Sequence, residues 1–210
     1  QNLGMAGNVY QNVVSLGVPS ILKTNNTLVE KRRYVEEKTN HMFLRVDSGE
    51  EKINRIQNLS IEFISGFDLI IISDYDKGFL LEQDIRFICD NHDCVFIDTK
   101  KKLGDFCKGC TYIKINKYEF ERSLDFLQNN SWAYNKTIQT IGGGGCKLAN
   151  KVFPVENVEI KDVCGAGDTF MASLCVKYLK TKDIETSITF ANECATKVVQ
   201  MKGVNTLNEF

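Results

Sequence analysis

Residues 162–171 read Asp-Val-Cys-Gly-Ala-Gly-Asp-Thr-Phe-Met, and apolar residues then recur at helical spacing as far as Leu179. The pattern predicts that Gly165, Ala166 and Gly167 lie where a loop becomes a helix. Backbone N–H groups are free at a helix start, and glycine lets the backbone approach a ligand closely. The stretch therefore predicts an anion-binding junction between a loop and a helix.

Asp168 follows the two glycines directly and falls in the first turn of the predicted helix. A bound anion repels a carboxylate, so a role as a further ligand does not explain this residue. A base that takes a proton from a hydroxyl group attacking a phosphate does explain it. The alternative interpretation is an acidic residue that interacts only with the helix dipole.

The composition is that of an ordinary globular domain. The chain has 210 residues, of which 43% are hydrophobic and 25% charged, and its net charge is −1. No broad basic surface for nucleic acid is expected from this charge. We find neither an apolar run long enough to cross a membrane nor a signal peptide, and we therefore expect a cytoplasmic protein. The chain opens at Gln1 inside a glycine-rich turn, which predicts an N-terminally truncated single domain over 1–210.

Eight cysteines are scattered along the chain. Cys107 and Cys110 have the Cys-x-x-Cys spacing of zinc sites, but a structural zinc site needs two more ligands at fitting positions. The chain has only two histidines, and Cys89 and Cys94 would complete a set only by an accident of the fold. We favour reduced thiols over a metal site.

Apolar runs with the character of buried strands alternate with helical patterns. Strands are expected at 20–23, 67–73, 94–97, 112–115, 137–141 and near 147–153, and helices within 4–16 and at 50–64, 80–91, 117–127, 166–180 and 183–201. This alternation predicts an α/β fold, a three-layer α/β/α sandwich with a mostly parallel sheet. A polar hairpin over about 28–47 does not fit that rhythm and is expected to form a small β lid.

Polar or flexible residues follow four of the expected strands. Asp74, Asp98, Asn116 and Gly142 come at or just after successive strand ends. Ligands of open α/β sheets bind beyond the carboxyl ends of the strands. Each residue alone could be an ordinary loop residue, but the series together with the glycine-rich helix start predicts a site at this edge.

Two motifs now carry a resemblance to a known family. Gly165-Ala166-Gly167-Asp168-Thr169-Phe170 matches the C-terminal signature of the ribokinase-like (PfkB) sugar kinases, and Gly4-Met5-Ala6-Gly7-Asn8-Val9 resembles their N-terminal Gly-Gly-Ala-Ala-Asn-Val turn. The resemblance extends over nearly the whole chain. It implies an ATP-dependent kinase that uses Mg²⁺, and in some members a monovalent cation such as K⁺.

Within that family the chain most resembles the heptose 7-phosphate kinase branch. Four segments carry this likeness: Ser73-Asp74-Tyr75-Asp76-Lys77-Gly78, Ile97-Asp98-Thr99-Lys100, Glu30-Lys31-Arg32-Arg33-Tyr34-Val35 and Leu44-Arg45-Val46-Asp47. The resemblance implies phosphoryl transfer to the anomeric hydroxyl of a heptose 7-phosphate. Kinases of ribose, fructose or nucleosides, and a non-catalytic binding protein, are the rival interpretations.

The resemblance also implies roles for individual residues. Asp168 would be the general base, and the N–H groups of Gly165, Ala166 and Gly167 would hold the developing negative charge. It places on the nucleotide side Lys100, Asn116, Glu119, Thr140, Gly142, Gly145 and Asn192. It places on the sugar side Gly4, Asn8, Lys31, Arg33, Arg45 and Asp74. Glu119 would act on Mg²⁺ indirectly, and Asp162 would belong to the loop that binds the monovalent cation.

Several of these residues have a simpler alternative. Asn8 could be a helix N-cap, and Glu119 could be an acidic residue of a first helical turn. Lys31, Arg33 and Arg45 could form a solvated strand face rather than a phosphate site.

The chain also departs from the family pattern. The link between Leu16 and Lys31 is short and lacks the usual Gly-Asp-Asp segment and helix, and four glycines occupy 142–145 where the family has charged residues. A polar hairpin has strand edges that invite pairing, so a homodimer through the lid is expected.

Overall fold

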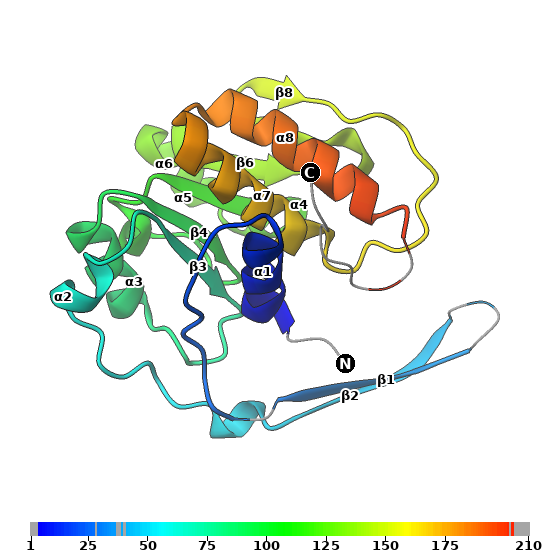
Figure 1. Cartoon of the computed structure of the whole chain (residues 1–210), viewed down its shortest axis with the longest axis horizontal. Coiled ribbons are helices and arrows are strands. Elements are labelled where there is room, and N and C mark those ends of the chain that lie inside the picture. The colour runs from blue at the N-terminus through cyan, green and yellow to red at the C-terminus, as the bar shows by residue number, and fades with distance from the viewer. Residues whose placement is uncertain (1–3, 28, 37–38, 40, 202, 204–210) are drawn as a thin grey trace.

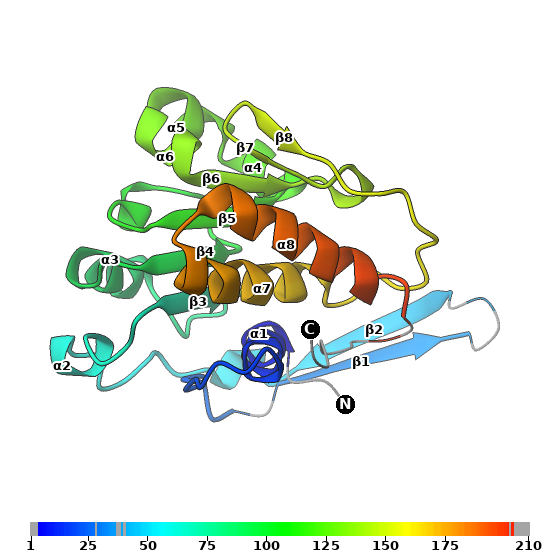
Figure 2. The same ribbon diagram turned by 45° about the horizontal axis from the view of Figure 1, so that its top comes forward.

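The computed structural model describes residues 4–27, 29–36, 39, 41–201 and 203. A central sheet carries helices on both faces, and a two-stranded hairpin projects from one end of the molecule (Figures 1 and 2). This arrangement is the expected three-layer α/β/α sandwich with a β lid.

The central sheet has six strands in the order β3-β4-β5-β6-β7-β8. Their bounds are β3 Ile70–Asp74, β4 Val95–Thr99, β5 Tyr112–Asn116, β6 Thr137–Thr140, β7 Cys146–Leu148 and β8 Lys151–Phe153. The first four strands are parallel, and β7 and β8 continue the sheet antiparallel. Strand β4 is buried at every position, as expected for a parallel strand covered on both faces.

One face of the sheet is covered by α1 (Gly4–Ser15), α7 (Ala166–Thr181) and α8 (Ile184–Val198). Val9, Phe170 and Ile188 from these three helices share an apolar cluster with Phe96 and Ile138 of the sheet. Helix α7 therefore lies directly on the sheet, and its first turn reaches the edge where the parallel strands end.

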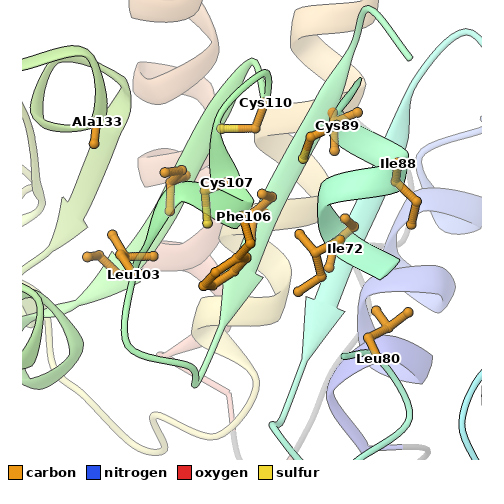
Figure 3. Packing of buried hydrophobic residues seen from close by; sticks show 14 of the residues in the cluster. Ile72, Leu80, Ile88, Cys89, Leu103, Phe106, Cys107, Cys110 and Ala133 are labelled. Carbon is orange, nitrogen blue, oxygen red and sulfur yellow. The ribbon is translucent and has the colours of Figure 1, made fainter. Parts of the chain in front are cut away.

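The other face is covered by α3 (Glu82–Asn91), α4 (Lys117–Arg122), α5 (Leu124–Asn129) and α6 (Ser131–Lys136). Its apolar cluster includes Ile72, Leu103 and Phe106 together with the thiols of Cys89, Cys107 and Cys110 (Figure 3).

The cysteines are free thiols in this structure. Burial raises the pKa of Cys89 and of Cys110 to about 12, so both thiols stay protonated at neutral pH. Within the described ranges, no group of three or more His, Cys, Asp or Glu side chains is arranged to hold a metal ion. No described helix has the length and apolar content needed to span a bilayer.

Two predictions for the segment between the first helix and the sheet are wrong. Residues 20–23 form no strand, and Ile21 is exposed. In place of a helix over 50–64 the chain forms a short 3₁₀ turn, η1 (Glu50–Lys52), and α2 (Ile61–Ile64). The intervening segment is held extended because the Ile56 N–H donates to the Phe79 carbonyl at 2.8 Å, and Asn58 adopts a left-handed φ of 57°.

The helix expected over 117–127 is broken at Ser123. The Ser123 side chain is buried and accepts a hydrogen bond from the Leu103 N–H at 3.1 Å, and a new helix, α5, begins at the next residue. Helix α6 and the 3₁₀ turns η2 (Asp105–Cys107) and η3 (Gly142–Gly144) complete the elements.

The lid consists of β1 (Glu30–Val35) and β2 (Met42–Ser48), paired antiparallel. The expected turn residues Lys38 and Asn40 lie outside the described residues. Lys31 faces Asp47 and Arg33 faces Arg45, so these four side chains share one face of the hairpin. The other face carries Tyr34 opposite Leu44.

Candidate active site

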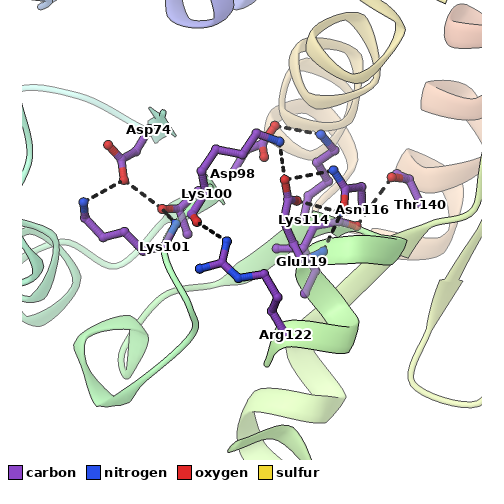
Figure 4. A network of polar contacts seen from close by, with 11 residues as sticks. Asp74, Asp98, Lys100, Lys101, Lys114, Asn116, Glu119, Arg122 and Thr140 are labelled. Atoms are coloured by element: carbon purple, nitrogen blue, oxygen red, sulfur yellow. Dashed lines mark hydrogen bonds and ion pairs between the residues drawn. The ribbon is translucent and has the colours of Figure 1, made fainter. Parts of the chain in front are cut away.

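The carboxyl ends of the parallel strands bring polar side chains to one edge of the sheet (Figure 4). Asp74 ends β3, Asp98 lies near the end of β4, and Asn116 ends β5 beside Thr140 of β6. The sequence-based prediction that these strand ends meet is confirmed, because parallel neighbours end on the same side.

Helix α7 starts at the same edge. Gly165 precedes it with a left-handed φ of 79°, a conformation that favours glycine. The Ala166 N–H donates to the Val163 carbonyl at 3.3 Å. The N–H groups of Gly165 and Gly167 have no partner among the described residues. The open part of the predicted anion loop is therefore formed by its two glycines.

Asp168 lies in the first turn of α7 and accepts a hydrogen bond of 2.9 Å from Asn8 Nδ2. Asn8 lies within α1 rather than at its start, which excludes the N-cap interpretation. The Asn8 Oδ1 atom is buried and has no hydrogen-bond partner in the described chain, so it can accept a bond from a ligand hydroxyl. The two family motifs thus meet at one carboxylate.

Burial raises the pKa of Asp168 to about 6. The hydrogen bond from Asn8 opposes this rise, nearby Asp98 adds to it, and the positive charges of Lys114 and Lys100 also oppose it. A carboxyl group with this pKa is ionised at neutral pH yet basic enough to accept a proton from a hydroxyl group in a transition state.

Asn116, Glu119 and Lys100 form a second cluster beside the first. Asn116 Oδ1 accepts from the Glu119 N–H at 2.9 Å, and Glu119 Oε2 accepts from the Asn116 N–H at 2.8 Å, so the pair caps α4. Glu119 Oε1 accepts from Asn116 Nδ2 at 2.8 Å and also contacts Lys100 Nζ. Glu119 therefore does serve its helix start, and it also fixes Lys100 at the sheet edge.

This cluster is suited to Mg²⁺ only in an indirect way. Both oxygens of Glu119 already accept hydrogen bonds, and the side chain is 3% exposed. Mg²⁺ commonly keeps several waters and is held by one or two carboxylates together with substrate phosphates. Glu119 and Asn116 fit that arrangement through the water shell of the ion.

Asp98 and Lys114 form a buried ion pair. Asp98 was expected at this edge of the sheet, whereas Lys114 was not predicted from the sequence. Lys114 Nζ donates to Asp98 Oδ2 at 2.7 Å, and both side chains are almost completely buried. Burial raises the pKa of Asp98, and the ammonium group of Lys114 opposes that rise. A lysine between two isoleucines of an apolar strand was the signal available in the sequence.

The carboxylate of Asp74 is buried at the sheet edge and is held by neighbouring groups of the protein. Its carboxylate accepts from Thr99 Oγ1 at 2.8 Å and from the Asp76 N–H at 3.0 Å, and it lies 3.4 Å from Lys101 Nζ. These contacts order the loop after β3, and a direct contact of Asp74 with the sugar stays a prediction.

The predicted nucleotide residues at the far end of the sheet also lie together. Thr140 pairs with Cys146 across β6 and β7, and Gly145 has a φ of 83°. A Cβ atom at Gly145 would lie 2.1 Å from the Phe153 carbonyl oxygen. That oxygen accepts a hydrogen bond of 3.0 Å from Asn192 Nδ2. Gly142, with a φ of 60°, has open space around it.

Asp162 orders the loop before α7. Its carboxylate accepts hydrogen bonds from the N–H groups of Cys164 at 2.9 Å and Gly203 at 3.1 Å, and the bond from Cys164 is the main cause of its lowered pKa. A role of this loop in binding a monovalent cation stays a prediction.

Tyr75 connects the lid with the anion loop. Lys31 Nζ lies 4.7 Å from the centre of the Tyr75 ring and 3.4 Å from Glu50 Oε1. Burial and the charge of Asp168 raise the pKa of Tyr75, while Arg33 opposes the rise. The basic face of the lid is therefore turned toward the body of the molecule. Gly4 begins α1 with a φ of 73°, in the helix that carries Asn8.

A parallel sheet whose edge holds an open helix start, a buried carboxylate and an amide bonded to it defines an α/β protein with a place for an anionic ligand at that edge. The comparisons with known proteins agree with this class. The pfkB family carbohydrate kinase model matches residues 20–210, and the chain belongs to this family.

Curated relatives share modest identity with this chain. The bifunctional protein HldE of Nitratiruptor sp. is 30% identical over 209 residues, which cover 89% of this chain and 45% of the relative. HldE of Campylobacter curvus is 30% identical over 257 residues, which cover 98% of this chain and 55% of the relative. The chain thus spans about half the length of these relatives. The second alignment is longer than the 210 residues of this chain, so the relative contains residues with no counterpart here.

Solved structures confirm the ribokinase-like fold. A nucleoside kinase of Burkholderia thailandensis matches with a TM-score of 0.69 at 14% identity, covering 94% of this chain and 79% of its own. Ribokinase of Thermotoga maritima matches with a TM-score of 0.65 at 17% identity, covering 89% of this chain and 67% of its own.

Proposed function

We propose that this kinase transfers the terminal phosphoryl group of ATP to the anomeric hydroxyl of a heptose 7-phosphate. Asp168 accepts the proton of that hydroxyl as the oxygen attacks phosphorus, while Asn8 holds the carboxylate in place. The N–H groups of Gly165 and Gly167 stabilise the charge that develops on the transferred group.

The second cluster serves the phosphate chain of ATP. Lys100 supplies positive charge, and Asn116 and Glu119 would hold Mg²⁺ through its water shell, where the ion neutralises phosphate charge. Positioning and charge stabilisation are the main requirements of phosphoryl transfer, so this small set of groups is sufficient.

The observation that carries the choice of a phosphorylated sugar is the pair Arg33 and Arg45. These residues face each other directly across the lid. Like charges in this position destabilise a strand pair, so an anionic ligand between them would relieve a repulsion. Asp47 offsets part of it, because its carboxylate accepts bonds from the Arg45 guanidinium at 2.7 and 2.6 Å. The four segments that resemble the heptose 7-phosphate kinase branch support the same substrate.

The test is a panel of sugars and sugar 7-phosphates assayed for ATP consumption, with the wild type and two variants. Replacing both Arg33 and Arg45 with alanine should raise KM for the sugar phosphate by about 10- to 100-fold, because two charge-assisted hydrogen bonds are lost. KM for ATP should not change. Arg32→Ala is the matched control, since Arg32 projects from the opposite face of the same strand and pairs with Glu30. Equal turnover of a neutral sugar would favour the rival sugar or nucleoside kinase.

We also propose that two copies of the chain associate through their lids. The face opposite the arginine pair carries three half-exposed apolar side chains, Tyr34, Leu44 and Val46. A second lid would cover these side chains and pair the strand edges. Leu44→Asp should convert a dimer into a monomer when mass is measured by light scattering, and a wild type that is monomeric at micromolar concentration would contradict the dimer.

A further inference from the structure

Lys114 occupies a position where a charged side chain is costly. It lies in the middle of β5, between β4 and β6, and its side chain is 7% exposed. Ile113 and Ile115 point to the apolar cluster under α3 to α6, so Lys114 points to the face covered by α7. A buried ammonium group must be compensated by a partner or by a ligand.

The partner inside the protein compensates this charge only in part. Lys114 pairs with Asp98, which faces it across the parallel strands. An ammonium group has three N–H donors, and Asp98 Oδ2 is the acceptor found for one of them in the described chain. Asp98 Oδ1 is buried and has no hydrogen-bond partner among these residues. The pair is therefore incomplete on both sides (Figure 4).

The ammonium group lies directly under the anion loop. A Cβ atom at Gly167 would lie 3.1 Å from Lys114 Nζ, so only glycine at this position lets the lysine reach the helix start without displacement. The helix start is itself positive, and Lys100 adds further positive charge nearby. Lys100 is paired with Glu119, so the positive charge that lies against Gly167 is that of Lys114.

We propose that Lys114 supplies a fixed positive charge to the transferred phosphoryl group from beneath Gly167, and that Asp98 is the positioning residue that holds it there. This inference rests on the proposed kinase function. The alternative is that Lys114 and Asp98 only neutralise each other within the sheet.

Two variants separate these interpretations. Lys114→Met should lower kcat by about 100-fold, as loss of one preorganised charge-stabilising group does, and should leave KM for the sugar within about threefold. Because this variant leaves Asp98 alone in the core, the double variant Lys114→Met with Asp98→Asn removes both charges at nearly constant volume. A slow double variant supports the proposal, and a double variant with wild-type kcat overturns it.

A control and a second measurement complete the experiment. Lys136→Met removes a lysine whose Nζ donates to the Cys110 carbonyl, at the opposite end of the sheet, and should leave kcat unchanged. Titration with inorganic phosphate should show at least about tenfold weaker binding to the double variant than to the wild type. Equal binding would overturn the proposal even if kcat falls. A wild type that phosphorylates no sugar would contradict the kinase function, and the phosphate titration would still decide the role of Lys114.

Discussion

Replacing the proposed base should make the protein more stable while it removes activity. Asp168 has a pKa of about 6 in the folded chain against an ordinary value of 3.8, because burial disfavours its charged form. Each step of one in pKa corresponds to about 1.36 kcal/mol, so keeping this carboxylate ionised costs the folded state about 3 kcal/mol. Asp168→Asn removes that charge, and the amide oxygen at position 168 can still accept the hydrogen bond from Asn8.

The gain in stability of Asp168→Asn over the wild type should increase as the pH rises. Between pH 3.8 and about 6 the folded chain keeps a proton on Asp168 that the unfolded chain has released. Raising the pH through this window therefore weakens folding of the wild type and leaves the variant unaffected. The variant should be more stable by about 3 kcal/mol at pH 8, and by less than about 1 kcal/mol at pH 4.

Urea unfolding followed by circular dichroism at pH 4 and pH 8 measures both differences. Asp68→Asn is the control, because Asp68 is an exposed loop residue. Turnover of Asp168→Asn should fall by at least about 100-fold, as for loss of a general base. A variant no more stable than the wild type at pH 8, or a gain of the same size at pH 4, would refute the reasoning.

The wild-type kcat/KM should rise with pH through about 6 as Asp168 loses its proton, and a profile flat from pH 5 to 8 would argue against this base. Gly145→Ala should lower the free energy of unfolding by about 3 kcal/mol or more, because the new Cβ atom would clash with the Phe153 carbonyl oxygen. Gly143→Ala is the control, since open space surrounds Gly143, and it should change the free energy of unfolding little. Asn192→Ala should lower the free energy of unfolding by about 1–3 kcal/mol, since it removes the buried donor to the Phe153 carbonyl, and an unchanged urea midpoint would contradict that contact.

Much of the sheet could be predicted from the sequence because parallel strands are apolar on both faces. Runs such as Ile-Ile-Ile-Ser before Asp74 and Val-Phe-Ile before Asp98 correspond to β3 and β4. The segment 50–64 could not be predicted in this way, because its helical spacing of apolar residues is overridden by a distant contact. The Ile56 N–H bonds to Phe79, and Ser60 caps a new helix.

The candidate site was predictable where glycine marks it. The junction at Gly165 and Gly167 is visible as sequence, and the helical apolar run after it places Asp168 in a first turn. The bond between Asp168 and Asn8 depends on α1 packing against α7, which no local pattern encodes. Lys114 was missed because its significance comes from Gly167, a residue far along the chain that leaves space for it.

The bond between Asn8 and Asp168 also affects when the protein becomes active as it folds. Its partners are 160 positions apart, so it belongs to the long-range contacts that form slowly. The intervening strands and helices rely largely on closer contacts and can form earlier. During refolding, phosphoryl transfer should therefore recover after the far-ultraviolet signal of secondary structure, and it would report the moment at which the first helix docks.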